Sequence, residues 1–267
     1  MAHVGFLQYD VAFGETEKNL DTVAAMLPEV AQADLLVLPE LAFSGYDFPD
    51  KETLRELAKP CEASGSLKQV MDWATEYNTA IVAGYPELAT EGIYNSCILA
   101  LPDGKYHNYR KIHLFNREQD IFLPGDAPPQ VYDTPAGGVG LMICFDWFFP
   151  ETARSLAMQG AQILAHPSNL VLQFCQQAMF ARCVENKVFA VTCNRIGMET
   201  QAGRDLGFTG ASQILDVQGQ ALAKAPDDSS YSAVVELDPT QADDKSIAEL
   251  NDRFQNRRPE LYTGLCP

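Results

Sequence analysis

Leu35-Leu-Val-Leu-Pro-Glu40 is the stretch of sequence that decides the fold. It opens with a continuous apolar run, which Pro39 ends. A strand with one face in water alternates apolar and polar residues, whereas an unbroken apolar run of this length is typical of a strand covered on both faces. We therefore expect an interior strand here, with Glu40 just beyond its carboxyl end.

The sequence before and after this run alternates strands and helices. Val4–Tyr9 is expected to form a strand, and a helix face follows it at spacings of 3, 4 and 3, formed by Leu20, Val23, Leu27 and Val30. Beyond the run, a helix is expected over 67–77 and a strand over 80–84. The turn Pro102-Asp-Gly104 then predicts a hairpin between strands at 93–100 and 105–111.

From residue 138 the same order returns. We expect strands at 139–144, 162–165 and 188–193, with helices over 151–159 and up to about residue 186. A hairpin around 217–219, a strand at 233–237 and a polar helix to about Phe254 complete the chain. Helices interleaved with buried strands and hairpins indicate an α/β fold whose sheet is mixed and covered by helices. We expect one domain over residues 1–267, in which the tail 255–267 has no predicted partner of its own.

Composition and charge exclude several classes of function. The chain has 267 residues, of which 46% are hydrophobic, and 19 Lys and Arg against 36 Asp and Glu give a net charge of −17. This balance argues against binding to nucleic acid or to an anionic membrane surface. Apolar runs stay far below the roughly 18–20 residues of a membrane span, and the N-terminus lacks a basic leader region, so a cytoplasmic location is the default expectation.

Cysteine usage gives no sign of a disulfide framework or a metal site. The seven cysteines form no CxxC or CxxH pair, and their odd number leaves at least one thiol free. We expect no metal and no cofactor. Cys175, Cys183 and Cys193 fall within expected helices or strands and are predicted to be core residues, whereas Cys61 and Cys266 are predicted to be surface thiols.

Four reactive side chains follow expected strands. Glu40, Lys111 and Cys144 each come after a different strand, and Glu118 lies in the loop after Lys111. Loops at the carboxyl ends of strands are where α/β proteins gather catalytic groups. Each residue alone also has a structural explanation, as a buried small apolar residue, a solvated lysine, or a glutamate that caps or pairs.

The neighbouring residues favour chemistry. Cys144 lies in Ile143-Cys-Phe-Asp-Trp-Phe-Phe-Pro-Glu151, where a strand ends and Pro150 marks the first turn of a helix whose dipoles favour a nearby thiolate. Tyr109-Arg-Lys-Ile-His-Leu-Phe115 sets cations among apolar residues. A desolvated lysine requires an anion, so we expect part of this charge at the rim of a pocket.

Three separate blocks resemble the nitrilase, or carbon–nitrogen hydrolase, superfamily, and the resemblance covers nearly the whole chain. Leu38-Pro-Glu40 with Ser44-Gly-Tyr46 is similar to the family's glutamate block. Tyr109–Leu114 is similar to its lysine block, and Ile143–Trp147 with Phe149-Pro-Glu151 is similar to its cysteine block. The blocks keep the family's order, and wide intervals separate them.

The resemblance implies a four-layer α-β-β-α sandwich with mixed sheets and a catalytic triad of Glu40, Lys111 and Cys144. The loop Glu118–Gly125 resembles the family loop that carries a second glutamate, which makes Glu118 the fourth catalytic candidate. Members usually pair into dimers or larger assemblies, so we expect a homo-oligomer in which the tail 255–267 packs on a partner subunit. The candidate substrate-binding residues are Phe145, Trp147, His166 and Asn169.

In the reaction that these groups imply, the Cys144 thiolate attacks a small amide, releases ammonia and leaves a thioester that water hydrolyses. Glu40 would move the protons, and Lys111 with the backbone N–H of Phe145 would stabilise the oxyanion. The Cys-Phe-Asp-Trp version of the cysteine block resembles aliphatic-amide and carbamoyl members more than typical nitrilases. Nitrile hydrolysis and N-carbamoyl hydrolysis by the same triad remain the alternatives.

Several other readings of single residues stay open at this stage. Glu118 could pair with Arg117 or Arg110 instead of serving catalysis. His113 lies two residues past Lys111 and could form a dyad with Cys144. Trp147 and the aromatics after it suit either a pocket wall or the core, and His166 suits either a structural or a pocket role. A carrier that merely retains the fold is the non-enzymatic alternative.

Overall fold

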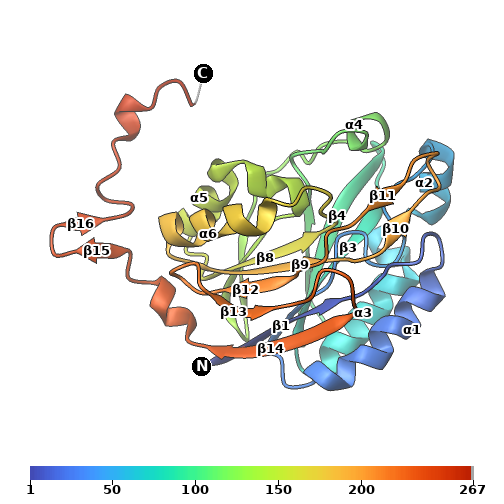
Figure 1. Cartoon of the computed structure of the whole chain (residues 1–267), viewed down its shortest axis with the longest axis horizontal. Helices are drawn as coiled ribbons and strands as arrows, with labels where there is room; N and C mark the ends of the chain where they lie inside the picture. The colour runs from blue at the N-terminus through green and yellow to red at the C-terminus, as the bar shows by residue number, and fades with distance from the viewer. Residues whose placement is uncertain (266–267) are drawn as a thin grey trace.

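The structure is a computed structural model, and it describes residues 1–265. Two six-stranded sheets form its centre (Figure 1). The strands of the first sheet are, in spatial order, β14 (Tyr231–Leu237), β1 (Ala2–Gln8), β2 (Leu35–Val37), β3 (Ala80–Leu88), β4 (Ile93–Ala100) and β5 (Tyr106–Arg110). Those of the second are β13 (Ala221–Lys224), β12 (Gln213–Leu215), β9 (Phe189–Asn194), β8 (Ile163–Ser168), β7 (Gly137–Leu141) and β6 (Val131–Thr134).

The helices and short strands surround these sheets. The α-helices are α1 (Thr16–Met26), α2 (Lys51–Leu57), α3 (Gly65–Glu76), α4 (Glu118–Ile121), α5 (Pro150–Met158) and α6 (Cys175–Asn186). The 3-10 helices are η1 (Leu27–Val30), η2 (Cys61–Ala63), η3 (Cys144–Phe148), η4 (Pro239–Ala242) and η5 (Pro259–Leu261). Two small hairpins pair β10 (Met198–Glu199) with β11 (Leu206–Gly207) and β15 (Ser246–Ala248) with β16 (Asn251–Asp252).

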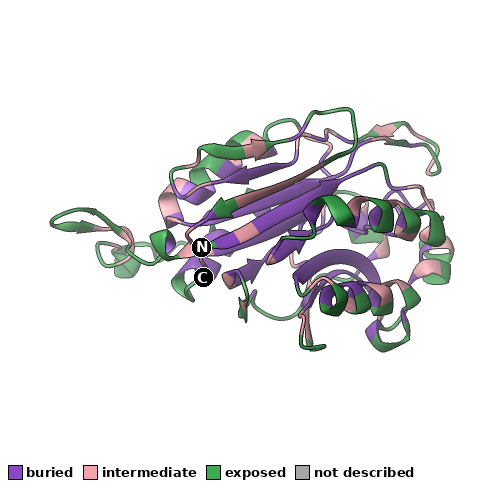
Figure 2. Cartoon of the chain, turned by 90° about the horizontal axis from the view of Figure 1, so that it is seen from below, coloured by how far each residue is buried: buried purple, intermediate pink, exposed green. Residues whose placement is uncertain are grey.

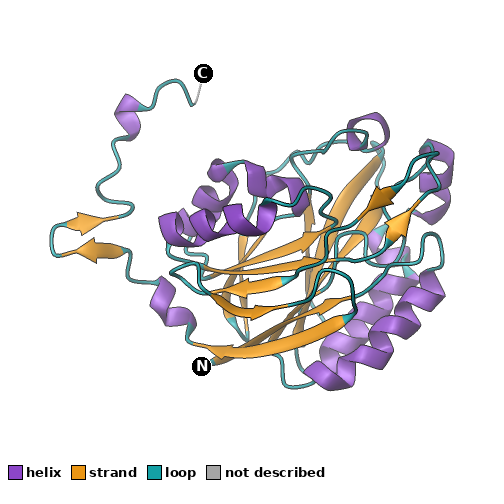
Figure 3. Ribbon diagram, in the orientation of Figure 1, coloured by secondary structure: helices purple, strands orange, loops and turns teal. Residues whose placement is uncertain are grey.

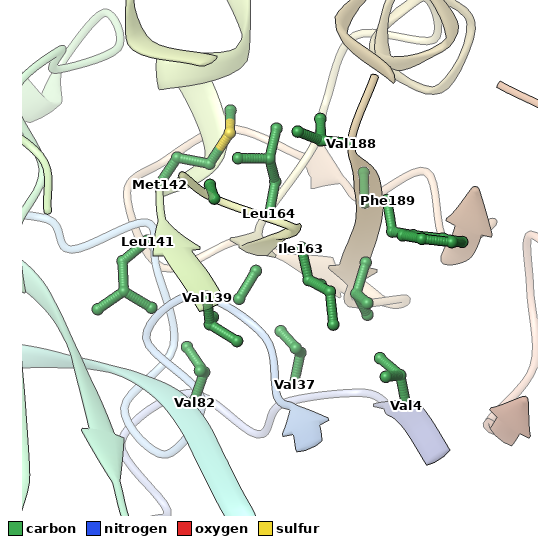
Figure 4. Packing of buried hydrophobic residues seen from close by; sticks show 14 of the residues in the cluster. Val4, Val37, Val82, Val139, Leu141, Met142, Ile163, Leu164, Val188 and Phe189 are labelled. Atoms are coloured by element: carbon green, nitrogen blue, oxygen red, sulfur yellow. The ribbon is translucent and has the colours of Figure 1, made fainter. Parts of the chain in front are cut away.

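Both main sheets are mixed, as the sequence predicts. The neighbours β1, β2 and β3 run parallel, as do β7, β8 and β9, while the outer pairs are antiparallel. The inner faces of the sheets meet in an apolar core, where Val4, Val37 and Val82 of the first sheet lie opposite Val139 and Ile163 of the second (Figure 4). Each fully buried side chain of this kind stabilises the fold by roughly 1.5–3 kcal/mol.

Helices cover the outer face of each sheet (Figure 3). Leu36 and Leu38 of the deciding run point outward into a second apolar cluster, with Val23 of α1 and Trp73 of α3. Helices α5 and α6 pack on the outer face of the other sheet. The run around β2 is therefore covered on both faces, and the order of layers is the predicted α-β-β-α.

The segment after β14 differs from the predicted polar helix. It forms η4 and the β15–β16 hairpin, and it projects from the sandwich as an exposed arm (Figures 1 and 2). Aspartates there accept hydrogen bonds from nearby backbone N–H groups: Asp238 from Thr240, and Asp244 from Ser246. Such local bonds compete with the helical ones, which explains why an exposed polar segment forms turns instead.

The thiol predictions are partly wrong. Cys175, Cys183 and Cys193 are buried as predicted, but Cys61 is also buried, in the apolar cluster under α1 and α3. Its polar neighbours along the chain gave no sign of this packing. The prediction for Cys266 lies outside the described residues. Within residues 1–265, no helix is long and apolar enough to cross a membrane.

Candidate active site

Four side chains from different elements converge between the two sheets' loops. Glu40 follows β2, Lys111 follows β5, Glu118 begins α4, and Cys144 begins η3 directly after the strand-like Ile143. The Lys111 Nζ lies 2.6 Å from Glu40 Oε1 and 2.7 Å from Glu118 Oε1. All four residues are buried, so these charges face one another rather than water.

Burial and mutual charge decide how this cluster holds its protons. Burial opposes the charged form of Lys111, but the charges of Glu118 and Glu40 outweigh it and raise the pKa of the ammonium. Burial raises the pKa of Glu118, although the Lys111 charge acts in the opposite direction. The Lys111 ammonium therefore stays charged, held between the two carboxyl groups.

The backbone around Glu40 is held by a close approach to β3. A Cβ on Gly84 would lie 2.3 Å from the backbone nitrogen of Leu41, so only glycine fits there. The Glu40 Oε1 also accepts a hydrogen bond from Asn95 Nδ2 at 2.7 Å. Its other oxygen, Oε2, is buried and has no hydrogen-bond partner in the described part of the chain. Glu40 thus keeps one oxygen for a reacting group.

Cys144 occupies a tight turn at the end of the β7 strand. Its φ of +38° is in the left-handed region, which non-glycine residues adopt only when the surrounding structure enforces it. Asp146 fastens the turn, because its carboxylate accepts from the Ile143 N–H at 2.8 Å and from the Tyr109 hydroxyl at 2.8 Å. His166 Nε2 lies 2.8 Å from the Cys144 carbonyl oxygen.

The thiol of Cys144 is protonated at rest, contrary to the helix-dipole expectation. Burial raises its pKa well above the usual value, and the charge of Glu40 raises it further, while Lys111 and the backbone N–H of Asn169 act in the opposite direction. The first turn of a helix does lie nearby, but it does not outweigh desolvation. A neighbouring base must therefore take the proton when the sulfur reacts.

Two cavities adjoin these residues. A narrow one, of about 10 Å³, is lined by Cys144 together with Phe115, Phe145, Trp147 and the segment 169–172. A larger one, of about 150 Å³, is lined by Glu118, Tyr46, Arg117 and Arg204 among others. Phe115 and Val171 line both cavities, so the two cavities lie side by side.

The structure distributes the candidate substrate-binding residues over two positions. Phe145, Trp147 and Asn169 line the narrow cavity beside Cys144. His166 is fully buried behind the turn, where Nδ1 lies 3.1 Å from the Thr192 hydroxyl and Nε2 contacts Cys144. His166 therefore supports the backbone of the turn, and it lines neither of the two cavities described above.

The other pairings that the sequence left open have different partners. Glu118 is bound to Lys111, whereas Arg110 pairs with Glu87 at 2.6 Å. The His113 ring Nδ1 lies 2.8 Å from Asp146 Oδ1, and the ring stacks on Phe149 with 3.7 Å between the ring centroids. Neither contact leads to Cys144, so the geometry gives the dyad no support.

Sequence reasoning missed Asn95 and the full role of Asp146. Asn95 and Ser96 are adjacent polar residues inside the largely apolar strand β4, and that contrast was the available signal. Asp146 belongs to the cysteine block, but the sequence indicated no role for it. In the structure its carboxylate connects the turn of Cys144 with Tyr109 and His113, which flank Lys111 in the chain.

The fold agrees with the comparisons with known proteins. The family model for carbon-nitrogen hydrolase matches residues 3–244. The chain therefore belongs to the carbon–nitrogen hydrolase family, and it is a nitrilase-superfamily hydrolase that acts on carbon–nitrogen bonds other than peptide bonds.

Particular relatives are amidases and a nitrilase. A nitrilase of Pyrococcus abyssi is 40% identical over 264 residues, covering 98% of this chain and 99% of the relative. An (R)-stereoselective amidase of Pseudomonas sp is 35% identical over 250 residues, covering 92% and 87%. Among solved structures, an amidase from Nesterenkonia sp. AN1, captured after Michael addition of acrylamide at its active site cysteine, aligns with a TM-score of 0.83 at 26% identity, covering 99% and 100%.

Proposed function

We propose that the protein hydrolyses small amides to acid and ammonia through a thioester on Cys144. The observation that carries this proposal is the placement of the Lys111 ammonium between Glu40 and Glu118, all buried and close enough to Cys144 for their charges to act on its thiol. A carrier or scaffold gains nothing from a buried cation shared by two carboxylates, since burying such charges is costly.

Each group has a role in this reaction. The Cys144 proton passes to Glu40 as the sulfur attacks the carbonyl carbon, which the raised pKa of the thiol makes necessary. An ammonium has three N–H groups, and Lys111 uses two of them on the carboxylates, so one remains for the substrate oxyanion. The backbone N–H of Phe145 is the second donor that we assign to the oxyanion.

The same groups complete the cycle. Glu40 returns its proton to the departing nitrogen, so the C–N bond breaks, ammonia leaves and the thioester remains. A water molecule then gives a proton to Glu40 and attacks the thioester, which releases the acid and expels the Cys144 thiolate. Glu40 passes that proton to the sulfur, which restores the thiol and the carboxylate. Glu118 is assigned to hold the amide –NH₂ and to fix Lys111. The Phe115 N–H donates to Glu118 Oε2 at 2.9 Å, so the carboxylate is held in one orientation for both roles.

Nitrile hydrolysis is the second candidate, favoured by the name of the Pyrococcus abyssi relative. The two carboxylates weigh against it, because an amide presents N–H groups to such acceptors and a nitrile presents none. N-carbamoyl compounds would use the same acceptors as amides and stay within the proposal as a related substrate class.

Ammonia release from amides and nitriles of matched carbon skeleton tests this assignment. We expect higher kcat/KM for each amide than for its nitrile, and a loss of amide turnover in Glu118→Ala while iodoacetamide still alkylates Cys144. Asp120→Ala, a change at an exposed carboxylate in the same short helix, is the matched control and should leave turnover unchanged. Faster nitrile turnover across the panel would contradict the amidase assignment and leave the cluster itself intact.

A further inference from the structure

Asn169 is a buried polar residue beside Cys144 whose side chain has no hydrogen-bond partner. It is 2% exposed, and neither Nδ2 nor Oδ1 has a partner among residues 1–265. Native proteins rarely leave a buried amide group without hydrogen bonds, and where they do a functional reason is expected.

Asn194 on the neighbouring strand β9 shows what a structural asparagine looks like here. Its Oδ1 accepts from the Leu170 N–H at 2.8 Å. Its Nδ2 donates to the Gly210 carbonyl at 2.7 Å and to the Thr209 hydroxyl at 3.0 Å. The fold therefore satisfies one buried asparagine completely and leaves the other, at the reactive cysteine, with both polar atoms free.

The surroundings of Asn169 indicate what its side chain can meet. It lines the narrow cavity with Cys144, and the other lining residues are aromatic or aliphatic. Its own backbone N–H is close enough to the Cys144 sulfur to stabilise the thiolate. A substrate group that bonds to the Asn169 side chain therefore lies in the same cavity as the acyl carbon that the sulfur attacks.

The reacting carboxamide has other partners. Its oxygen is served by the remaining N–H of Lys111 and by Phe145, and its nitrogen by the free Oε2 of Glu40 and by Glu118. The Asn169 side chain is surplus to these needs. It offers both a donor and an acceptor, which a hydroxyl group satisfies because it accepts and donates at one atom.

We propose that Asn169 binds a second polar group on the acyl part of the substrate, so that the preferred substrates are amides with a hydroxyl group on the carbon next to the carbonyl. This inference rests on the proposed amidase function and narrows it. An amide with a plain hydrocarbon acyl group would bury the Asn169 side chain without hydrogen-bond partners. Sites that hydrogen-bond a substrate hydroxyl discriminate strongly against analogues that lack it.

Lactamide and isobutyramide provide the test, because they have the same shape and differ in one hydroxyl against one methyl group. We expect the wild type to favour lactamide in kcat/KM by roughly 10- to 100-fold. Asn169→Leu should abolish this preference by impairing lactamide while sparing isobutyramide. Asn169→Ala serves as a second variant with the same expected loss of preference should the leucine not fit. Leu172→Ala changes the size of the same cavity wall and should affect both substrates alike.

Binding to Cys144→Ala separates this inference from the proposed function. Calorimetry on that inactive variant should give lactamide roughly tenfold or more tighter binding than isobutyramide, and adding Asn169→Leu should remove the difference. A wild type without preference in both turnover and binding overturns the inference. Equal impairment of both amides by Asn169→Leu also overturns it, because Asn169 would then hold the reacting carboxamide. If neither amide releases ammonia but the binding difference holds, the proposed reaction fails and the Asn169 subsite stands.

Discussion

Replacing His166 should make the protein less sensitive to acid. A carbonyl oxygen can only accept, so Nε2 carries the proton that it donates to the Cys144 carbonyl, and Nδ1 accepts from the Thr192 hydroxyl. Burial favours this neutral ring and lowers the pKa of His166 from 6.5 to about 4. Between about pH 4 and pH 6.5 His166 is therefore protonated in the unfolded chain and neutral in the folded chain. Stability from the neutral ring is complete above about pH 6.5 and is lost as the pH falls toward 4.

A depression of this size corresponds to roughly 3 kcal/mol, at about 1.4 kcal/mol for each pH unit. His166→Gln keeps an N–H donor but cannot titrate. Between pH 7 and pH 4 the free energy of unfolding of this variant should therefore fall by about 3 kcal/mol less than that of the wild type. Urea unfolding of both proteins at several pH values and one protein concentration measures the difference. His3→Gln, at a side chain that is 42% exposed, is the control and should follow the wild type. Parallel pH profiles for His166→Gln and the wild type would refute the reasoning.

Three further outcomes follow from the structure. Glu40→Gln should lower kcat for ammonia release by about 10²–10⁴-fold and Lys111→Ala by about 10²–10³-fold, and normal kcat in either variant would remove that group from the reaction. Because the pKa of Cys144 is raised, its labelling by iodoacetamide should keep accelerating from about pH 7 to about pH 9; a plateau at neutral pH would mean a resting thiolate. Light scattering should give at least twice 29.4 kDa, and deletion of residues 255–267 should lower this mass, whereas an active wild-type monomer would contradict assembly through the tail.

The tail prediction draws on the shape of the exposed arm. Leu261, Tyr262 and Leu265 of the tail are 66%, 43% and 63% exposed, on a segment that leaves the sandwich in Figure 1. Large apolar side chains that gather on one projecting segment are unusual on a monomer surface. We expect these side chains to pack on a second copy of this chain.

The sequence was most informative where burial leaves a local pattern. The unbroken run at Leu35–Leu38 predicted a strand covered on both faces, and its alternate residues do pack into different clusters. The predicted strand ends put Glu40, Lys111 and Cys144 just after three different strands. In the structure they follow β2, β5 and β7 and lie close together. These inferences needed only the order of elements along the chain.

Properties that depend on several segments at once could not be predicted in this way. The raised pKa of Cys144 follows from burial and from a carboxylate 104 residues away, and no local signal near the turn reports either. The free amide of Asn169 is visible only once the partners of its neighbour Asn194 are known. Cys61 lies next to polar residues in the sequence, yet it is buried in the apolar cluster between the first sheet and helices α1 and α3.

The central claim is that Cys144 carries the acyl group during amide hydrolysis, and mass spectrometry of the enzyme quenched during turnover tests it most directly. We expect a protein adduct with the mass of the amide less ammonia, mapped to the peptide that contains Cys144. We expect neither adduct nor ammonia from Cys144→Ala with its fold intact. Ammonia release by Cys144→Ala at a rate near that of the wild type, or an adduct on another residue, would contradict it.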